Sequence, residues 1–227
     1  MSTPTVTTTP RFTDDLRAAA GDQWDRVIHH KFTKELACSS MDMQVMKRYL
    51  IQDHRFLDTF VVLLSSMIAH ARCLSDRIPG CQFLALITGA ENTYFERCFE
   101  KLDGCSVADR DLIPYAACTT GFCDLMREVA MKGTLGEMLS VLVVCEWSYL
   151  SWGQLVEKEC VRDDFVFYEW VDLHTGETFE AVVAYLRGLL DKEGALIDDA
   201  GRELCQKRFL QAMQLEEDFF ENAYATP

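Results

Sequence analysis

The sequence predicts an all-α fold, a single-domain helical bundle. Apolar residues recur at helical spacing through most of the 227 residues, and no stretch alternates polar and apolar residues as strands do. The chain also lacks a Gly-rich phosphate loop and an internal repeat. Its length suits one large domain, and no change in composition marks a boundary. We therefore expect a Thr- and Pro-rich disordered tail over residues 1–11 and one helical domain over residues 12–227.

Capping and breaking residues divide the first half of this domain. Thr13, followed by two aspartates, can cap a first helix whose apolar positions recur at helical spacing as far as Phe32. Ser39 and Ser40 then open a second helix, and Gly133 ends a fourth. The predicted helices after the first cover residues 42–71, 77–102 and 114–133.

The second half begins with a central helix over residues 138–156. After a polar break at residues 162–164, the segment 168–179 forms a shorter element with a turn at Gly176. A helix over 182–190, which Gly194 ends, and a last helix over 198–223 complete the bundle. The connections are short, as expected for helices that pack against one another.

Charge and cysteine usage exclude several functional classes. A formal net charge of −14 argues against a nucleic-acid or anionic-membrane partner, since both require a basic surface. The N-terminal residues contain no apolar signal segment, and the ten cysteines form no zinc-binding pattern. We therefore expect a soluble, cytoplasmic protein with reduced thiols and no bound metal.

The central helix carries the most informative residues. The stretch 138–156 contains a single formal charge, Glu146, next to Cys145 and one turn before Tyr149. Burying a carboxylate is costly unless it has a partner or lines a wet cavity, so these residues indicate a site. A core helix with an ordinary buried cysteine is the simpler alternative. A transmembrane helix is less favoured, because polar residues interrupt the stretch on several faces.

Two further carboxylates stand on other helices. Asp53 lies on or beside the apolar face of the second helix, and Glu216 shares its face with two phenylalanines three and four residues later. Aromatic residues accompany each candidate: Phe56, Phe122, Tyr149 and Trp170. A flat heteroaromatic ligand would fit such a pocket, stacked between rings and held at its edges by carboxylates.

Other chemistries lack the residues that they need. A di-iron site in a helical bundle requires Glu-x-x-His on two helices, and no glutamate here is followed by histidine at that spacing. No serine lies in a nucleophile-elbow pattern. A thiol nucleophile assisted by a carboxylic acid remains.

Four separated segments resemble one known family. WDRVIHHKF and MKRYLIQD near the N-terminus, GTLGEMLSVLVVCEWSY in the centre and LEEDFFENAY near the C-terminus are similar to the thiaminase II/TenA family. The resemblance covers nearly the whole chain after the tail. It implies a haem-oxygenase-like all-α fold, assembled as a homotetramer without haem, metal or another cofactor. It also implies a hydrolase in thiamin salvage that acts on thiamin or on 4-amino-2-methylpyrimidines with a leaving group on the 5-methylene carbon.

The same resemblance assigns roles by position. Cys145 corresponds to the nucleophile, Glu216 to the catalytic glutamate and Asp53 to the aspartate that binds the pyrimidine amine. Tyr149 corresponds to the tyrosine after the cysteine. We expect the pKa of Glu216, which shares a proton with a ring nitrogen, to exceed that of Asp53.

Four positions depart from the family pattern or combine its variants. Phe56, Phe122 and His174 stand where the family has tyrosines, and all three are expected to line the substrate pocket. Glu146 occupies the position of the glutamate that replaces the cysteine in one branch of the family, so either Cys145 or Glu146 could drive catalysis. These departures leave two alternatives: a catalytically weak pyrimidine-binding or regulatory protein, and a cofactor-free oxidase of the same fold.

Overall fold

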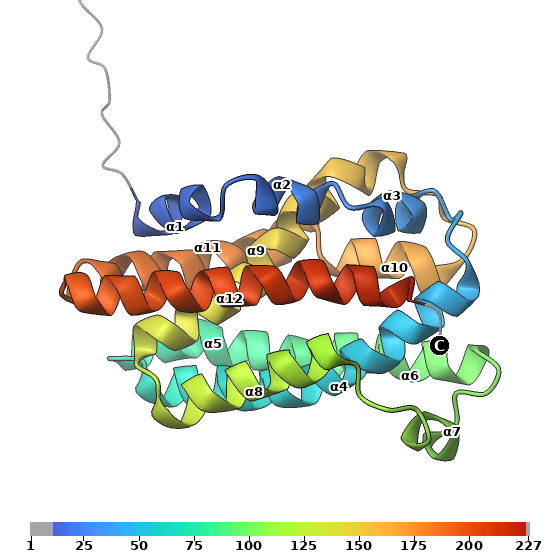
Figure 1. Cartoon of the computed structure of the whole chain (residues 1–227), viewed down its shortest axis with the longest axis horizontal. Coiled ribbons are helices and arrows are strands. Elements are labelled where there is room, and N and C mark those ends of the chain that lie inside the picture. Colours follow the sequence, from blue (N-terminus) through green and yellow to red (C-terminus); the bar gives the residue numbers. More distant parts are fainter. Residues whose placement is uncertain (1–10, 226–227) are drawn as a thin grey trace, which may run out of the picture.

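The computed structural model describes residues 11–225, and every regular element in this part of the chain is a helix. The helices form layers: α12 crosses the middle of the molecule between α1–α3 on one side and α4, α5 and α8 on the other (Figure 1). The central α9 packs against α12, α11 and α4. Residues 1–10 and 226–227 lie outside the described residues, so the tail expected over 1–11 stays a prediction.

The element bounds in chain order are α1 (Phe12–Ala20), α2 (Asp22–Ile28), α3 (Lys31–Ala37), α4 (Met43–His70), α5 (Leu74–Leu86), η1 (Ile87–Glu91), α6 (Asn92–Lys101), α7 (Val107–Asp111), α8 (Ala117–Lys132), α9 (Leu135–Val156), η2 (Glu157–Glu159), α10 (Phe165–Leu173), α11 (Gly176–Gly194) and α12 (Asp199–Ala223).

The long predicted helices agree with the structure, whereas the first one is wrong. The segment predicted as one helix is three short helices, α1, α2 and α3. Gly21 separates the first two with φ +53° and ψ −135°, a conformation that disfavours residues with a side chain. His30 then starts α3, because its Nδ1 accepts a hydrogen bond from the backbone N–H of Phe32 at 3.1 Å.

The third predicted helix is correct in extent but not in regularity. It begins at Leu74, somewhat before the predicted residue 77, and is interrupted by the π-helical turn η1 before continuing as α6. The short helix α7, which a capping box at Ser106 begins, was not predicted. The helix expected over 182–190 extends back to Gly176, so the turn predicted there is its first residue.

The central helix α9 is buried on nearly all sides, which explains its lack of amphipathic character. It is long and apolar enough to cross a membrane, yet 72% of its most apolar stretch is buried against the other helices. A capping box between Thr134 and Glu137 begins it, and Arg208 of α12 donates a hydrogen bond from Nε to Glu137 at 3.1 Å. This ion pair fixes α9 against α12, the two helices that carry Cys145 and Glu216.

Candidate active site

One cavity gathers all of the side chains that the sequence singled out. It contains about 450 Å³ of empty space, counting the open solvent at its mouth. The helices α4, α8, α9, α10 and α12 and the turn η1 supply its walls. The predicted residues that line it are Asp53, Phe56, Phe122, Cys145, Glu146, Tyr149, His174 and Glu216.

Six further residues complete the wall: Leu57, Phe60, Ile87, Glu91, Trp170 and Phe219. Four of these are apolar or aromatic neighbours that the helical pattern already placed near the site. Ile87 and Glu91 were missed because they lie at the two ends of the π-helical turn, where the 3.6-residue period does not hold. The sequence around them, ITGAEN, offers no periodic signal that could have found them.

Four carboxyl groups face the cavity, and none of its lining residues is a lysine or arginine. Desolvation is the main cause that raises the pKa of each. It raises the pKa of Asp53 to about 7 and that of Glu216 to about 8. The pKa values of Glu91 and Glu146 lie well above the usual range, because the charge of a neighbouring carboxylate adds to the effect of burial. Glu216 therefore has a higher pKa than Asp53, although both are strongly raised.

Cys145 is buried beside Glu216. Burial, followed by the charges of Glu216 and Glu146, raises the pKa of the thiol well above its ordinary value. The neighbouring thiol works in the opposite direction on Glu216 and lowers its pKa somewhat. The cysteine is thus a neutral thiol at rest, and a carboxyl group that titrates near pH 8 lies close to it.

A tyrosine pair connects the other side of the cavity to Asp53. The hydroxyls of Tyr49 and Tyr149 lie 2.6 Å apart and share a buried hydrogen bond. A hydrogen bond from Tyr49 also lowers the pKa of Asp53, which is one turn further along α4. A phenol has a single proton, so when Tyr49 donates to ionised Asp53, Tyr149 donates to Tyr49. The i, i+4 spacing was visible in the sequence, but this functional link was not predicted.

His174 is held as a neutral ring. Its Nδ1 donates a hydrogen bond to the backbone carbonyl of Trp170 at 2.8 Å, and burial lowers its pKa to about 4. Nε2 is therefore an unprotonated acceptor, whereas the tyrosine expected from the family pattern would be able to donate. The ring packs 4.8 Å from that of Tyr149. Gly153 permits this approach, because a Cβ there would lie 2.8 Å from the His174 carbonyl oxygen.

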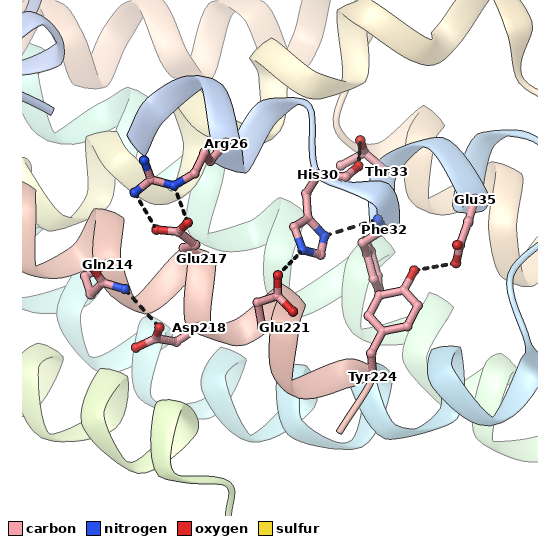
Figure 2. A network of polar contacts seen from close by, with 10 residues as sticks. All are labelled: Arg26, His30, Phe32, Thr33, Glu35, Gln214, Glu217, Asp218, Glu221 and Tyr224. Carbon is pink, nitrogen blue, oxygen red and sulfur yellow. Dashed lines mark hydrogen bonds and ion pairs between the residues drawn. The ribbon is translucent and has the colours of Figure 1, made fainter. Parts of the chain in front are cut away.

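A polar network holds the outer face of α12 while its inner face lines the cavity (Figure 2). Glu217 accepts from Arg26 at 2.5 Å, and Glu221 pairs with Nε2 of His30 at 3.1 Å. Both partners come from the short N-terminal helices and their connection. The network fixes the rotation of α12, so that Glu216 and Phe219 point into the cavity.

The site is not arranged as a metal centre. Among the residues that the structure describes, no group of three or more His, Cys, Asp or Glu side chains is placed to hold a metal ion. The chemistry that the cavity offers is that of a thiol, carboxyl groups close to their titration range, and aromatic walls.

The helical architecture around this carboxyl-lined cavity defines a fold of the haem-oxygenase-like class. Haem oxygenase-1 from the cyanobacterium Synechocystis sp. has a similar fold, with a TM-score of 0.58 at 16% identity over 95% of this chain and 93% of the other. The family can be stated more closely. The chain belongs to the TENA/THI-4/PQQC family, whose model matches residues 17–226.

Relatives are similar over nearly the whole chain. An aminopyrimidine aminohydrolase from Halalkalibacterium halodurans is 23% identical over 214 residues, which cover 94% of this chain and 95% of that protein. A TenA homologue from Pyrococcus furiosus has a TM-score of 0.83 at 19% identity, covering 94% of this chain and all of the other. The haem-oxygenase-like all-α fold expected from the sequence is therefore confirmed.

The raised pKa of Glu216 predicts a pH-dependent stability cost. Because its folded-state pKa of about 8 exceeds the unfolded value, the folded state binds the extra proton, and stability from this group falls as pH rises from about 4 to above 8. Glu216→Gln removes that loss. We expect the variant to gain roughly 2–4 kcal/mol relative to the wild type between pH 5 and pH 9 in chemical denaturation.

Asp218→Asn on the exposed face of the same helix is the matched control, and it should show no comparable change between the two pH values. A Glu216→Gln variant whose stability relative to the wild type is the same at both pH values would contradict the assigned environment.

Proposed function

We propose that this protein is an aminopyrimidine aminohydrolase of the thiaminase II type. It hydrolyses 4-amino-2-methylpyrimidines that carry a leaving group on the 5-methylene carbon, including thiamin, and releases the hydroxymethylpyrimidine. One observation carries the proposal: a thiol and four carboxyl groups from four elements, α4, η1, α9 and α12, meet in one aromatic cavity. The relatives named aminopyrimidine aminohydrolase support the substrate class.

Recognition would use the two carboxyls of intermediate pKa. Asp53, which ionises above about pH 7, accepts a hydrogen bond from the exocyclic amine, with Tyr49 as its neighbour on α4. Glu216 pairs with a ring nitrogen. Phe56 and Phe122, whose ring centroids lie 5.0 Å apart in an edge-to-face arrangement, and Phe219 offer apolar surfaces for the ring. Tyr149, Glu146 and His174 border the remaining space, where the substituent and the attacking water lie.

The thiol proton makes the chemical step possible. Glu216, which carries a proton below about pH 8, gives it to the ring nitrogen as Sγ bonds to an electron-poor ring carbon, and the carboxylate so formed takes the proton of the Cys145 thiol. The electron pair of the dearomatised ring then expels the substituent, and the C–N bond pair leaves with its nitrogen. Water adds its oxygen to the methylene carbon and gives a proton to the departed amine. Loss of sulfur restores the aromatic ring and the thiol. One water is consumed, and an alcohol and an amine are formed.

A binding or regulatory role of the same cavity is the second candidate. It is favoured by the loss of two tyrosine hydroxyls at Phe56 and Phe122 and by the high pKa of the Cys145 thiol. It predicts that hydroxymethylpyrimidine binds while neither aminopyrimidine nor thiamin is hydrolysed. A cofactor-free oxidase would instead consume oxygen. Release of hydroxymethylpyrimidine, measured beside oxygen uptake, separates the three.

Assembly and location belong to the same proposal. A homotetramer is supported by large apolar side chains left exposed on the single chain, such as Leu112 and Met131, at 84% and 78% exposure. A cytoplasmic location is supported by ten free cysteines, since none of them forms a disulfide within residues 11–225.

If Cys145 is the nucleophile, Cys145→Ser should reduce kcat by roughly two to four orders of magnitude, because a serine hydroxyl is a much weaker nucleophile at neutral pH. The fold should survive, since the two side chains have nearly the same shape. Steady-state hydrolysis of aminopyrimidine and a melting curve measure both.

Cys123→Ser, another buried thiol but outside the cavity, is the control and should retain activity. Activity of Cys145→Ser within about threefold of the wild type would transfer the catalytic role to Glu146 and water. In that case Glu146→Gln should abolish turnover.

The pyrimidine assignment of Asp53 predicts weaker binding in Asp53→Asn. Losing a charge-assisted hydrogen bond in a buried site costs about 1–3 kcal/mol, so the Kd for hydroxymethylpyrimidine should rise at least about tenfold at pH 8. The wild-type affinity should itself fall as pH drops below about 7, where Asp53 becomes protonated, and the variant should lack this dependence on Asp53. Calorimetric titration between pH 6 and pH 8 measures both effects.

Asp58→Asn, on the exposed side of the same helix, should bind as the wild type does. If Asp53→Asn binds hydroxymethylpyrimidine with unchanged affinity, Asp53 does not contact the amine and the proposed ligand class loses its main support.

A further inference from the structure

The four carboxyls of the cavity fall into two pairs with different surroundings. Asp53 and Glu216 each have a neighbouring polar side chain that lowers the raised pKa, Tyr49 and Cys145 respectively. Glu91 and Glu146 have none: within residues 11–225 neither carboxyl takes part in a hydrogen bond or an ion pair. Glu146 is only 9% exposed and still lines the cavity. Glu91 is half-buried and lines the same cavity, so a ligand in the cavity can reach both carboxyls.

Glu91 and Glu146 line the same cavity, and the negative charge of Glu146 acts on Glu91. The charge of Glu146 is the largest cause after burial that raises the pKa of Glu91. Without a ligand, protonation relieves the repulsion between two such groups. A cation between them would relieve it as well, and no lysine or arginine lines the cavity to serve as that cation.

Glu91 occupies a boundary between two cavities. Glu91 and Ile87, at the two ends of the π-helical turn η1, also line a second cavity of about 700 Å³ of empty space including its opening. Leu86, Ala90 and Phe179 give this cavity an apolar surface, and Glu177 adds a carboxylate. The lining contains no basic side chain, and Asp172 there is already paired with Arg162 at 2.7 Å. π-Helical turns of this kind are common at functional sites.

We propose that Glu91 is a specificity-determining residue: it binds the positively charged substituent on the 5-methylene carbon, with Glu146 as its partner, and the second cavity receives the leaving group. This inference rests on the proposed function. An ammonium or a thiazolium group supplies the cation that the Glu91–Glu146 pair lacks. The hydrogen bonds between an ammonium group and two carboxylates are of the strong, charge-assisted kind.

Cleavage of the C–N bond would itself weaken the interaction between the substituent and the two carboxylates. When the C–N bond breaks, its electron pair leaves with the nitrogen, so the cationic substituent becomes a neutral amine or thiazole. A neutral group is no longer held by the charge of the two carboxylates. The second cavity, reached past the Glu91 side chain, then offers it an apolar surface and a route away from the water that replaces it.

The decisive variant is Glu91→Gln, which keeps the shape of the side chain and removes its charge. We expect KM for the 5-aminomethylpyrimidine, whose substituent is a cation, to rise at least about tenfold. For the N-formylaminomethyl substrate, which is uncharged, kcat/KM should change by less than about threefold. The Kd of hydroxymethylpyrimidine, also uncharged, should change equally little. A purely structural role of Glu91 would affect all three ligands alike and would overturn the proposal.

Two further variants guard against misfolding and nonspecific effects. Glu91→Asp keeps the charge and should restore part of the preference for the cationic substrate. Glu100→Gln, on the exposed face of α6, removes one negative charge outside the cavity and should leave all three ligands unaffected. If Glu91→Gln fails to fold, the wild type alone is informative. A preference of less than about threefold for the aminomethyl over the hydroxymethyl compound would overturn the role of the carboxyl pair.

The second cavity is tested by leaving-group size. Ala90→Trp narrows that cavity without adding atoms to the first, which Ala90 does not line. We expect kcat for thiamin, whose thiazole is bulky, to fall at least about threefold more than kcat for the aminomethyl substrate, which releases ammonia. An equal effect on both would remove the second cavity from the proposal. If the wild type neither binds hydroxymethylpyrimidine nor hydrolyses any of these compounds, the proposed function itself fails, a result distinct from all the others.

Discussion

The structure depends on one unfavourable arrangement, three buried carboxyl groups and one half-buried carboxyl group around a cavity without a basic side chain. Such groups stay buried only where the surrounding scaffold is rigid enough to prevent collapse or the entry of bulk water. Here the scaffold is aromatic: Tyr49 contacts Phe32, Phe219, Phe220 and Trp170, and the neutral His174 packs edge-on against Trp170 at 4.4 Å. These rings provide the buried area that stabilises the fold and set the low polarity that raises the carboxyl pKa values. Stability and reactivity therefore arise from the same side chains.

The long helices could be predicted from the sequence, because apolar residues recur along them at helical spacing. Long helices such as α4, α9 and α12 were predicted within a few residues, and Cys145 and Glu216 lie on two of them as expected. Their meeting in one cavity followed from the family resemblance, since periodicity alone assigns a residue to a face but not to a partner helix. The irregular parts were not readable. The break at Gly21 divides an apolar pattern that looks continuous, and η1 shifts the register so that Glu91 enters the cavity from a segment with no periodic signal.

The departures from the family pattern redistribute polarity within the site. Phenylalanine at positions 56 and 122 makes one wall of the cavity apolar, and these two rings pack against each other and against Phe219. The polar side chains of the cavity are thereby mainly the carboxyls, Cys145, Tyr149 and His174. His174 contributes an acceptor where a tyrosine would contribute a donor, because its only ring proton is committed to the Trp170 carbonyl. The cavity as a whole is thus rich in acceptors, which suits a ligand that brings most of the donors and the positive charge.

The two faces of α12 show how such a site can be held in place. On the outer face, Glu217 and Glu221 find Arg26 and His30, and these exposed or half-exposed pairs contribute modestly to stability. On the inner face, Glu216 has as polar neighbours only the thiol of Cys145 and the negative charge of Asp53. Glu216 and Glu217 are adjacent in the sequence, yet the protein stabilises the ionised form of Glu217 and not that of Glu216. Because the outer pairs fix the rotation of α12, Glu216 cannot turn away from the cavity toward solvent. Its pKa therefore stays raised as long as no ligand binds beside it.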